Sequence, residues 1–467
     1  MKFGRLFLRT TALVAALIMF TGVFAAASER VGVTNTAGKA GNTIITAYAA
    51  EDGAVAEKSK SGDAADYSKP AGKTMKLKKK SVVSSEEMTA GYNSFSMKAL
   101  KQVLAQEKEG KNVMISPASL MFALNMAAMG AKGRTYRQMA ALLAKGATKK
   151  DLDSFSKAYR ASLEEGGQIN VANSLWINDL CLKNLNISVN EKFLNLLRRD
   201  FKAATESLDF DDKAKNEING WISDKTNGMI KNALDDIDPT ALMLIINAIA
   251  FEGKWADPYE DYQINENGKF TNYKGEKEDA KMLSSREHMY FTGFEAQGFL
   301  KFYEDSKYAF MAILPDDESV SINDFVMNLP DDAFETLYGS RYHAKVDTLT
   351  PALTFDYGIT LNDTLKKMGM KKAFNKDADF TDIIDPATLS PELLVYISRV
   401  IQKTHIELDE NGTKASAATI IEFKAEATAA PNHDPIMCVI LDRPFAFAIV
   451  DTATGTPVFT GVVNSVK

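Results

Sequence analysis

The chain has 467 residues, and a hydrophobic fraction of 45% is enough for a large core in one large domain or two moderate ones. A formal net charge of -6 argues against a nucleic-acid partner, because no basic stripe dominates the chain outside one run near the N-terminus. Only two cysteines are present, so no disulfide framework supports the fold. A bridge between Cys181 and Cys438 is one alternative, and two buried free thiols are the favoured one.

The N-terminus has the residue order of a secretory signal. Basic residues at Lys2, Arg5 and Arg9 precede an uncharged run from Thr10 to Ala27 that ends in three alanines. We therefore expect residues 1–27 to be a signal peptide and the protein to be secreted or extracytoplasmic, with no membrane association after signal removal. An uncleaved anchor is the less favoured alternative, because the run is short and poorly flanked for a membrane span.

Residues 28–83 are predicted to be a flexible low-complexity spacer. They are rich in Ala, Gly, Ser, Thr and Lys and end in the basic run 73–80, KTMKLKKK. Such a run could contact a cell-wall or membrane surface, but a solvated linker is the favoured interpretation.

Order is expected from Ser84, where the sequence SSEE predicts a capping box at the start of a helix. The second helix should begin at Ser116 and Pro117, with serine as the cap and proline at the first helical position. The expected buried faces are Met88, Tyr92, Phe95, Ala99, Leu100, Val103 and Leu104 in the first helix, and Leu120, Leu124, Ala127 and Ala128 in the second.

The rest of the chain mixes further helices with β-branched or aromatic runs. Helices are predicted over 191–202, 213–225 and 361–368, and strands over 244–251, 308–314 and 445–450. These elements do not alternate as βαβ units, which favours an α+β fold with large antiparallel sheets. With no second linker in sight, residues 84–467 are expected to form a single domain.

Residues 407–426 alternate like a strand although their composition is that of a loop. Small or apolar side chains occupy one register, and the other register is mostly polar, so one face could be buried. The inward set is Thr413, Ala415, Ala417, Thr419, Ile421, Phe423 and Ala425. The chain enters this segment through Asn411 and Gly412, which can turn freely.

Seven motifs in order along the chain resemble the serpin family, and the match runs from about Ser84 to the C-terminus. Each motif is weak alone, and the ordered set is specific. The motifs are NVMISPASL at 112–120, INGWISDKTNGMI at 218–230, NAIAFEGKW at 247–255, MAILP at 311–315, LKKMGM at 365–370, ENGTKASAAT at 410–419 and DRPFAF at 442–447.

The resemblance implies the serpin fold, which has three β-sheets, eight or nine helices and an exposed reactive-centre loop, here about residues 410–436. It also implies an irreversible suicide-substrate inhibitor of serine proteases, in metastable form. In the family, the loop is cleaved, inserts into the main sheet as an extra strand and carries the covalently acylated protease with it. The protein would then be a monomer, without cofactor or metal, and would not be an enzyme.

The resemblance assigns a hinge and a reactive bond. The family's usual spacing, counted from Glu410, places the bond between Glu426 and Ala427, where the alternation also ends. Lys424, Ala425 and Thr428 remain alternatives. The many small residues here favour an elastase- or subtilisin-like target, while Lys424 leaves a trypsin-like one open. The hinge is Glu410, Gly412, Thr413, Ala415, Ser416, Ala417, Ala418 and Thr419.

The resemblance also implies a gate beneath the point where the main sheet opens. Ser116, Ser119 and Asn247 match its hydrogen-bonded cluster, and Trp255 matches a residue near the top of the opening through which the loop enters the sheet. Gln402 stands where many members carry histidine, and because glutamine does not titrate we expect little pH sensitivity near neutrality. Ordinary capping and core packing are the plainer explanations, and they are compatible with this role.

Other functions find less support in the sequence. The four histidines form no metal-ligand motif, and no nucleophile elbow or phosphate loop is present. Asp209, Asp211 and Asp212 are better explained by a solvated turn than by a cation site. A non-inhibitory serpin-fold binding or chaperone protein remains the alternative. It is less favoured because Gly412 to Thr419 has no bulky, charged or proline residue on the inward register. Defence of an exporting bacterium against foreign proteases is the expected use.

Overall fold

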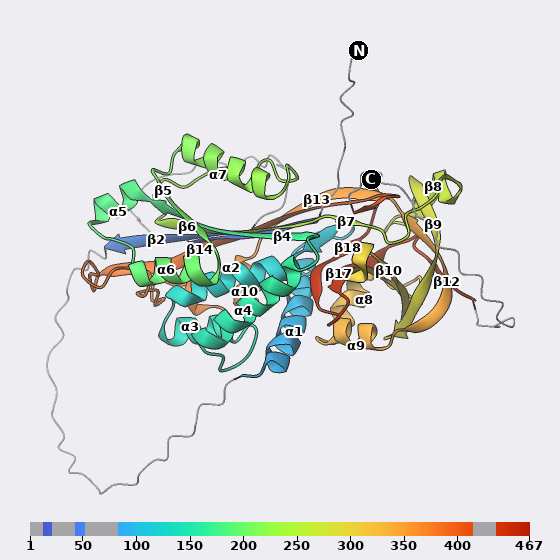
Figure 1. Cartoon of the computed structure of the whole chain (residues 1–467), viewed down its shortest axis with the longest axis horizontal. Helices are drawn as coiled ribbons and strands as arrows, with labels where there is room; N and C mark the ends of the chain where they lie inside the picture. Colours follow the sequence, from blue (N-terminus) through green and yellow to red (C-terminus); the bar gives the residue numbers. More distant parts are fainter. Residues whose placement is uncertain (1–12, 21–42, 52–82, 414–435) are drawn as a thin grey trace, which may run out of the picture.

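The computed structural model describes residues 13–20, 43–51, 83–413 and 436–467. In these ranges it has ten α-helices, and helices α2, α3, α4 and α10 cover one face of a large sheet while α7 lies on the other (Figure 1). The helices are α1 Ser85–Leu104, α2 Pro117–Gly130, α3 Gly133–Ala140, α4 Lys149–Glu164, α5 Asp179–Leu185, α6 Glu191–Asp200, α7 Asp212–Lys225, α8 Ile322–Asn328, α9 Ala333–Gly339 and α10 Asn362–Lys367. Short 3-10 turns are η1 Asp261–Gln263, η2 Glu304–Ser306 and η3 Lys372–Phe374.

The main sheet has seven strands in the order β13-β14-β1-β2-β6-β4-β5. Strands β1 and β2 come from the N-terminal region and lie between β6 and β14. The strands are β1 Leu13–Phe20, β2 Thr43–Glu51, β4 Ile169–Asn178, β5 Ala204–Leu208, β6 Met243–Phe251, β13 Leu353–Thr360 and β14 Leu393–Leu408.

The second sheet follows the order β16-β12-β9-β10-β11-β17-β18-β3, with β8 paired to β9, and the third pairs β15 with β7. The three expected sheets are thus present among the described residues. The helices exceed the expected eight or nine because segments as short as α5 form separate helices. The strands are β3 Val113–Ile115, β7 Gly253–Lys254, β8 Ile264–Thr271, β9 Lys277–Gly293, β10 Ala296–Phe302, β11 Tyr308–Pro315, β12 Tyr342–Pro351, β15 Gly412–Thr413, β16 Ile436–Ile440, β17 Phe445–Asp451 and β18 Pro457–Val463.

Both predicted helix starts are confirmed. Ser84 and Glu87 form a reciprocal capping box, with Glu87 N donating to Ser84 Oγ (3.1 Å) and Ser84 N to Glu87 Oε2 (2.8 Å). Ser116 caps α2, and Pro117 is its first residue. All predicted inward residues of the two helices are buried. Helix α2 is buried on every side because it packs between the main sheet and helices α1, α3 and α4.

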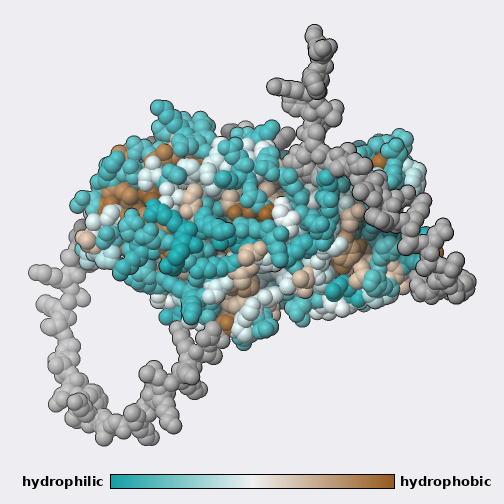
Figure 2. All heavy atoms as spheres, viewed as in Figure 1, coloured by the Kyte–Doolittle hydropathy of each residue, from teal (hydrophilic) through white to brown (hydrophobic). Residues whose placement is uncertain are grey.

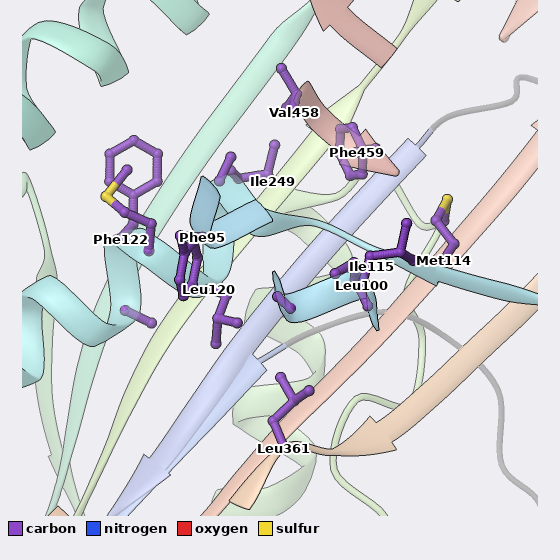
Figure 3. Close-up of a cluster of buried hydrophobic side chains, with 14 of the residues drawn as sticks. Phe95, Leu100, Met114, Ile115, Leu120, Phe122, Ile249, Leu361, Val458 and Phe459 are labelled. Atoms are coloured by element: carbon purple, nitrogen blue, oxygen red, sulfur yellow. The ribbon is translucent and has the colours of Figure 1, made fainter. Parts of the chain in front are cut away.

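The core is continuous from the first helices to the main sheet. Figure 3 shows Phe95 and Leu100 of α1 close to Leu120 of α2, Ile115 of β3 and Ile249 of β6, and all five are buried. The face shown in Figure 2 is mostly hydrophilic, with small scattered hydrophobic spots. Among the described residues, no helix has both the length and the apolar character to cross a membrane.

Three expectations need correction. Helix α6 ends at Asp200 rather than Lys202, because Lys202 has left-handed backbone geometry (φ 50°). The cysteines are free as favoured, but the expectation that both are buried is wrong, since Cys438 is exposed on the edge strand β16 and Cys181 is half-buried. The flexible spacer does not extend over Thr43–Glu51, because these residues form β2.

Candidate site for strand insertion

The predicted hinge begins in a tight turn at the end of β14. Asp409 Oδ1 accepts hydrogen bonds from the backbone N–H groups of Asn411 (2.8 Å) and Gly412 (3.2 Å), and Asp409 N donates to Gly412 O (3.1 Å). Gly412 has φ +150°, and a Cβ there would lie 2.4 Å from Gly253 O. Only glycine fits this position without moving backbone.

After the turn, the hinge already pairs with a strand. Gly412 lies opposite Lys254 and Thr413 opposite Gly253 in the antiparallel pair β15–β7. Thr413 is fully buried, and its hydroxyl is hydrogen-bonded to the hydroxyl of Tyr303 (2.9 Å). Because β7 follows directly after β6, the hinge strand is placed at the end of β6 in the main sheet.

Trp255 fixes this turn through both its backbone and its side chain. Its indole Nε1–H donates to Asp409 O (2.9 Å), and its backbone N–H donates to Asn411 O (3.1 Å). The ring stacks on Tyr303 with centroids 4.5 Å apart, and only 2% of Trp255 is exposed. Trp255 therefore holds the hinge in addition to packing in the core.

Two neighbouring carboxyl groups at the turn differ in their protonation behaviour. Burial raises the pKa of Asp409, and the N–H groups of Asn411 and Gly412 offset only part of that effect. Burial also acts upward on Glu410, but Lys281 at 2.8 Å outweighs it and holds the pKa of Glu410 below its ordinary value. The hinge thus has one stabilised and one destabilised negative charge.

The expected gate residues on β14 and α2 are hydrogen-bonded to one another. Gln402 Nε2 donates to Ser116 O (2.9 Å), and Ser116 N donates to Gln402 Oε1 (3.3 Å). Ser116 Oγ accepts from Ser119 N (3.4 Å) and donates to Val458 O (2.8 Å). The fully buried Gln402 side chain therefore both donates a hydrogen bond to Ser116 and accepts one from it.

The same chain of hydrogen bonds continues from α2 to side chains on β6 and β4. Ser119 Oγ donates to Asn247 Oδ1, and Asn247 Nδ2 donates to Asn173 Oδ1 (2.9 Å). Asn173 Nδ2 in turn donates to Phe201 O (2.7 Å). Side chains on β14, α2, β6 and β4 are thereby connected beneath the region between β6 and β14. Sequence reasoning missed Asn173, although an asparagine within the mostly apolar run of β4 was a usable signal.

The structure separates Trp255 from the other four gate residues, since it lies at the hinge and not in the hydrogen-bonded cluster. The hinge residues Ala415 to Thr419, and Lys424, Ala425, Glu426, Ala427 and Thr428 at the reactive bond, lie outside the described residues. Asp211 caps α7 by accepting from Lys213 N (2.8 Å) and Ala214 N (2.9 Å). In the part of the chain that the structure describes, no three His, Cys, Asp or Glu side chains gather as metal ligands.

Comparison with known proteins gives matches over most of the chain. The family model described as Serpin (serine protease inhibitor) matches residues 90–466. Serpin-ZX of Arabidopsis thaliana is 27% identical over 390 residues, covering 79% of this chain and 96% of that protein. The crystal structure of tengpin, a thermophilic serpin in the native state, shares 32% identity, a TM-score of 0.70, and coverage of 81% of this chain and 94% of that one. Thyroxine-binding globulin in complex with thyroxine has a TM-score of 0.66 at 21% identity, with coverage of 82% and 100%.

Proposed function

Because the chain belongs to the serpin family, whose members include serine protease inhibitors, we propose that it is a secreted, monomeric suicide-substrate inhibitor of serine proteases. The target protease attacks the reactive-centre loop as a substrate. Its cleavage yields a covalent acyl complex, and the loop then enters the main sheet before the acyl bond is hydrolysed.

The observation that carries the proposal is the pairing of the hinge with β7. Thr413 lies opposite Gly253, so the same antiparallel register continued along β6 would place Ala415 opposite Phe251 and Phe423 opposite Met243. A strand in this position forms ladder hydrogen bonds on both sides. At about 0.5–1.5 kcal/mol net each, about a dozen bonds would supply on the order of ten kcal/mol. That free energy is sufficient to drive a large displacement.

The composition of the hinge supports insertion over a purely binding role. Thr413 is already buried and hydrogen-bonded to Tyr303, and the next inward residues, Ala415 and Ala417, are small and uncharged. Their burial costs little desolvation free energy, so they would not oppose the gain from the ladder. We further propose an elastase- or subtilisin-like target and a reactive bond at Glu426–Ala427, in a bacterial exported protein.

The test is incubation of the chain that begins at Ser28 with a panel of serine proteases. The expected result is an SDS-resistant complex together with a released C-terminal peptide whose mass is that of residues 427–467. Cleavage of every molecule without any complex would refute inhibition and would favour the non-inhibitory binding role instead.

A further inference from the structure

The position between β6 and β14 is occupied by the protein's own N-terminal region. Strand β1 is antiparallel to β6 and to β14 and parallel to β2, with Leu13 opposite Phe251 and Phe20 opposite Met243 on β6. On its other side, Val14 lies opposite His405 on β14. In Figure 3 the pale blue strands run between the yellow-green β6 and the salmon β14. We call the position between β6 and β14 the insertion slot, and its half next to the hinge at Gly253 the upper half. Strand β1 therefore fills the upper half of the slot.

Strand β2 fills the lower half against β14. Glu51 lies opposite Leu393 and Ile45 opposite Val400, and the Ile45 side chain is fully buried. At its start, Thr43 lies opposite Asn247, which belongs to the hydrogen-bonded cluster beneath the slot. The N-terminal region is thus integrated into the sheet over nearly the whole length of β14.

The N-terminal strands pair with the same backbone groups of β6 that an inserting loop would need. The hinge register, continued from Thr413, runs along β6 from Phe251 to Met243, and β1 pairs with that same stretch. One edge of a strand can pair with only one neighbour at a time, because each backbone N–H and C=O makes its ladder bond once. The N-terminal strands and the inserted loop therefore exclude each other.

We propose that β1 and β2 are an internal occupant of the loop-insertion slot, and that the loop can insert only when they leave it. This inference rests on the proposed function. Strand β1 lies within the apolar core of the predicted signal peptide, whereas β2 follows it in the chain. Removal of residues 1–27 would vacate the upper half of the slot, next to the hinge at Gly253, and would leave β2 on Leu393–Val400. The precursor would be blocked, and the exported chain would need only to displace β2.

The experiment compares three forms of the protein with the protease that gives the strongest complex. The forms are the chain from Met1 made in a cell-free system without signal peptidase, the chain from Ser28, and the chain from Ser28 with Ile45→Pro. Proline removes a ladder N–H from β2, and Thr36→Pro, outside both strands, is the matched control. The rate of complex formation should rise in that order, by at least about tenfold from first to last. Equal rates in all three would overturn the inference.

A disulfide cross-link tests whether β2 occupies the slot beside β14, and it does not depend on protease inhibition. In a Cys181→Ser, Cys438→Ser background, Tyr48→Cys and Tyr396→Cys are opposite one another in the β2–β14 register. The chain from Ser28 should form this disulfide on mild oxidation, while Tyr48→Cys with Tyr342→Cys, on the second sheet, should not. If no form makes a protease complex, the proposed function fails, and the cross-link still decides this inference. Its absence from the first pair would overturn the inference.

Discussion

The hinge glycine gives the sharpest test of the insertion site. Gly412→Ala places a Cβ 2.4 Å from Gly253 O and 2.6 Å from Lys254 Cα, both of which are backbone atoms of the strand that the hinge must join. The φ of +150° adds strain of about 1–3 kcal/mol for a non-glycine residue. Loss of the Gly412–Lys254 and Thr413–Gly253 pairing would remove a further ~1–3 kcal/mol of ladder hydrogen bonds.

Gly412→Ala should therefore slow insertion, so that more of the acyl intermediate is hydrolysed and more inhibitor is consumed per protease inactivated. The stoichiometry of inhibition measures this directly, and hydrogen exchange at residues 253–255 should report the detached hinge. Gly275→Ala is the matched control, because Gly275 has φ +80° but nothing within 4 Å of the added Cβ. An unchanged stoichiometry for Gly412→Ala, with residues 253–255 still protected, would refute the reasoning.

Three further predictions concern the hinge and the gate. Thr413→Arg places an unpaired charge beside Tyr303 at a cost of several kcal/mol and should convert the inhibitor into a substrate, whereas Thr413→Ser should not; equal stoichiometries for the two variants would contradict this. Gln402→His should make Tm decrease as the pH drops below about 6.5, since burial disfavours the protonated imidazolium, which also cannot accept a hydrogen bond from Ser116 N. The Tm of the unmodified protein should stay flat in this range, and a sharp transition there would contradict the reasoning. Asp409→Asn should raise Tm at pH 7 and little at pH 4, because the raised pKa of Asp409 makes the folded state lose stability as pH rises through it; a gain of equal size at both pH values would be inconsistent with this cause.

The sequence predicted those parts of the fold that local chemistry dictates. The capping box at Ser84, the serine cap and proline of α2 and the buried strand β6 depend on neighbouring residues, and each was found at its expected place. The cluster of Gln402 with Ser116 could be expected only through the family resemblance, because these residues are far apart in sequence and meet through tertiary packing.

The N-terminal strands could not be predicted in the same way. An uncharged apolar run such as Leu13–Phe20 has the same appearance in a signal peptide and in a strand buried on both faces. Thr43–Glu51 lies in a stretch whose Ala, Gly, Ser and Thr content suggested a linker, and the open position in the sheet that it fills is formed by residues hundreds of positions away. Partner availability, which no local pattern encodes, decided both cases.

The most direct test of loop insertion is the thermal stability of the protein before and after cleavage of its reactive-centre loop. The chain from Ser28 is nicked by a protease that it does not trap, and the two forms are compared by calorimetry. Insertion of the cleaved loop as a new strand predicts a large rise in Tm, because a fully paired central strand is added to the main sheet. An unchanged or lower Tm would show that the cleaved loop stays outside the sheet and would contradict the account.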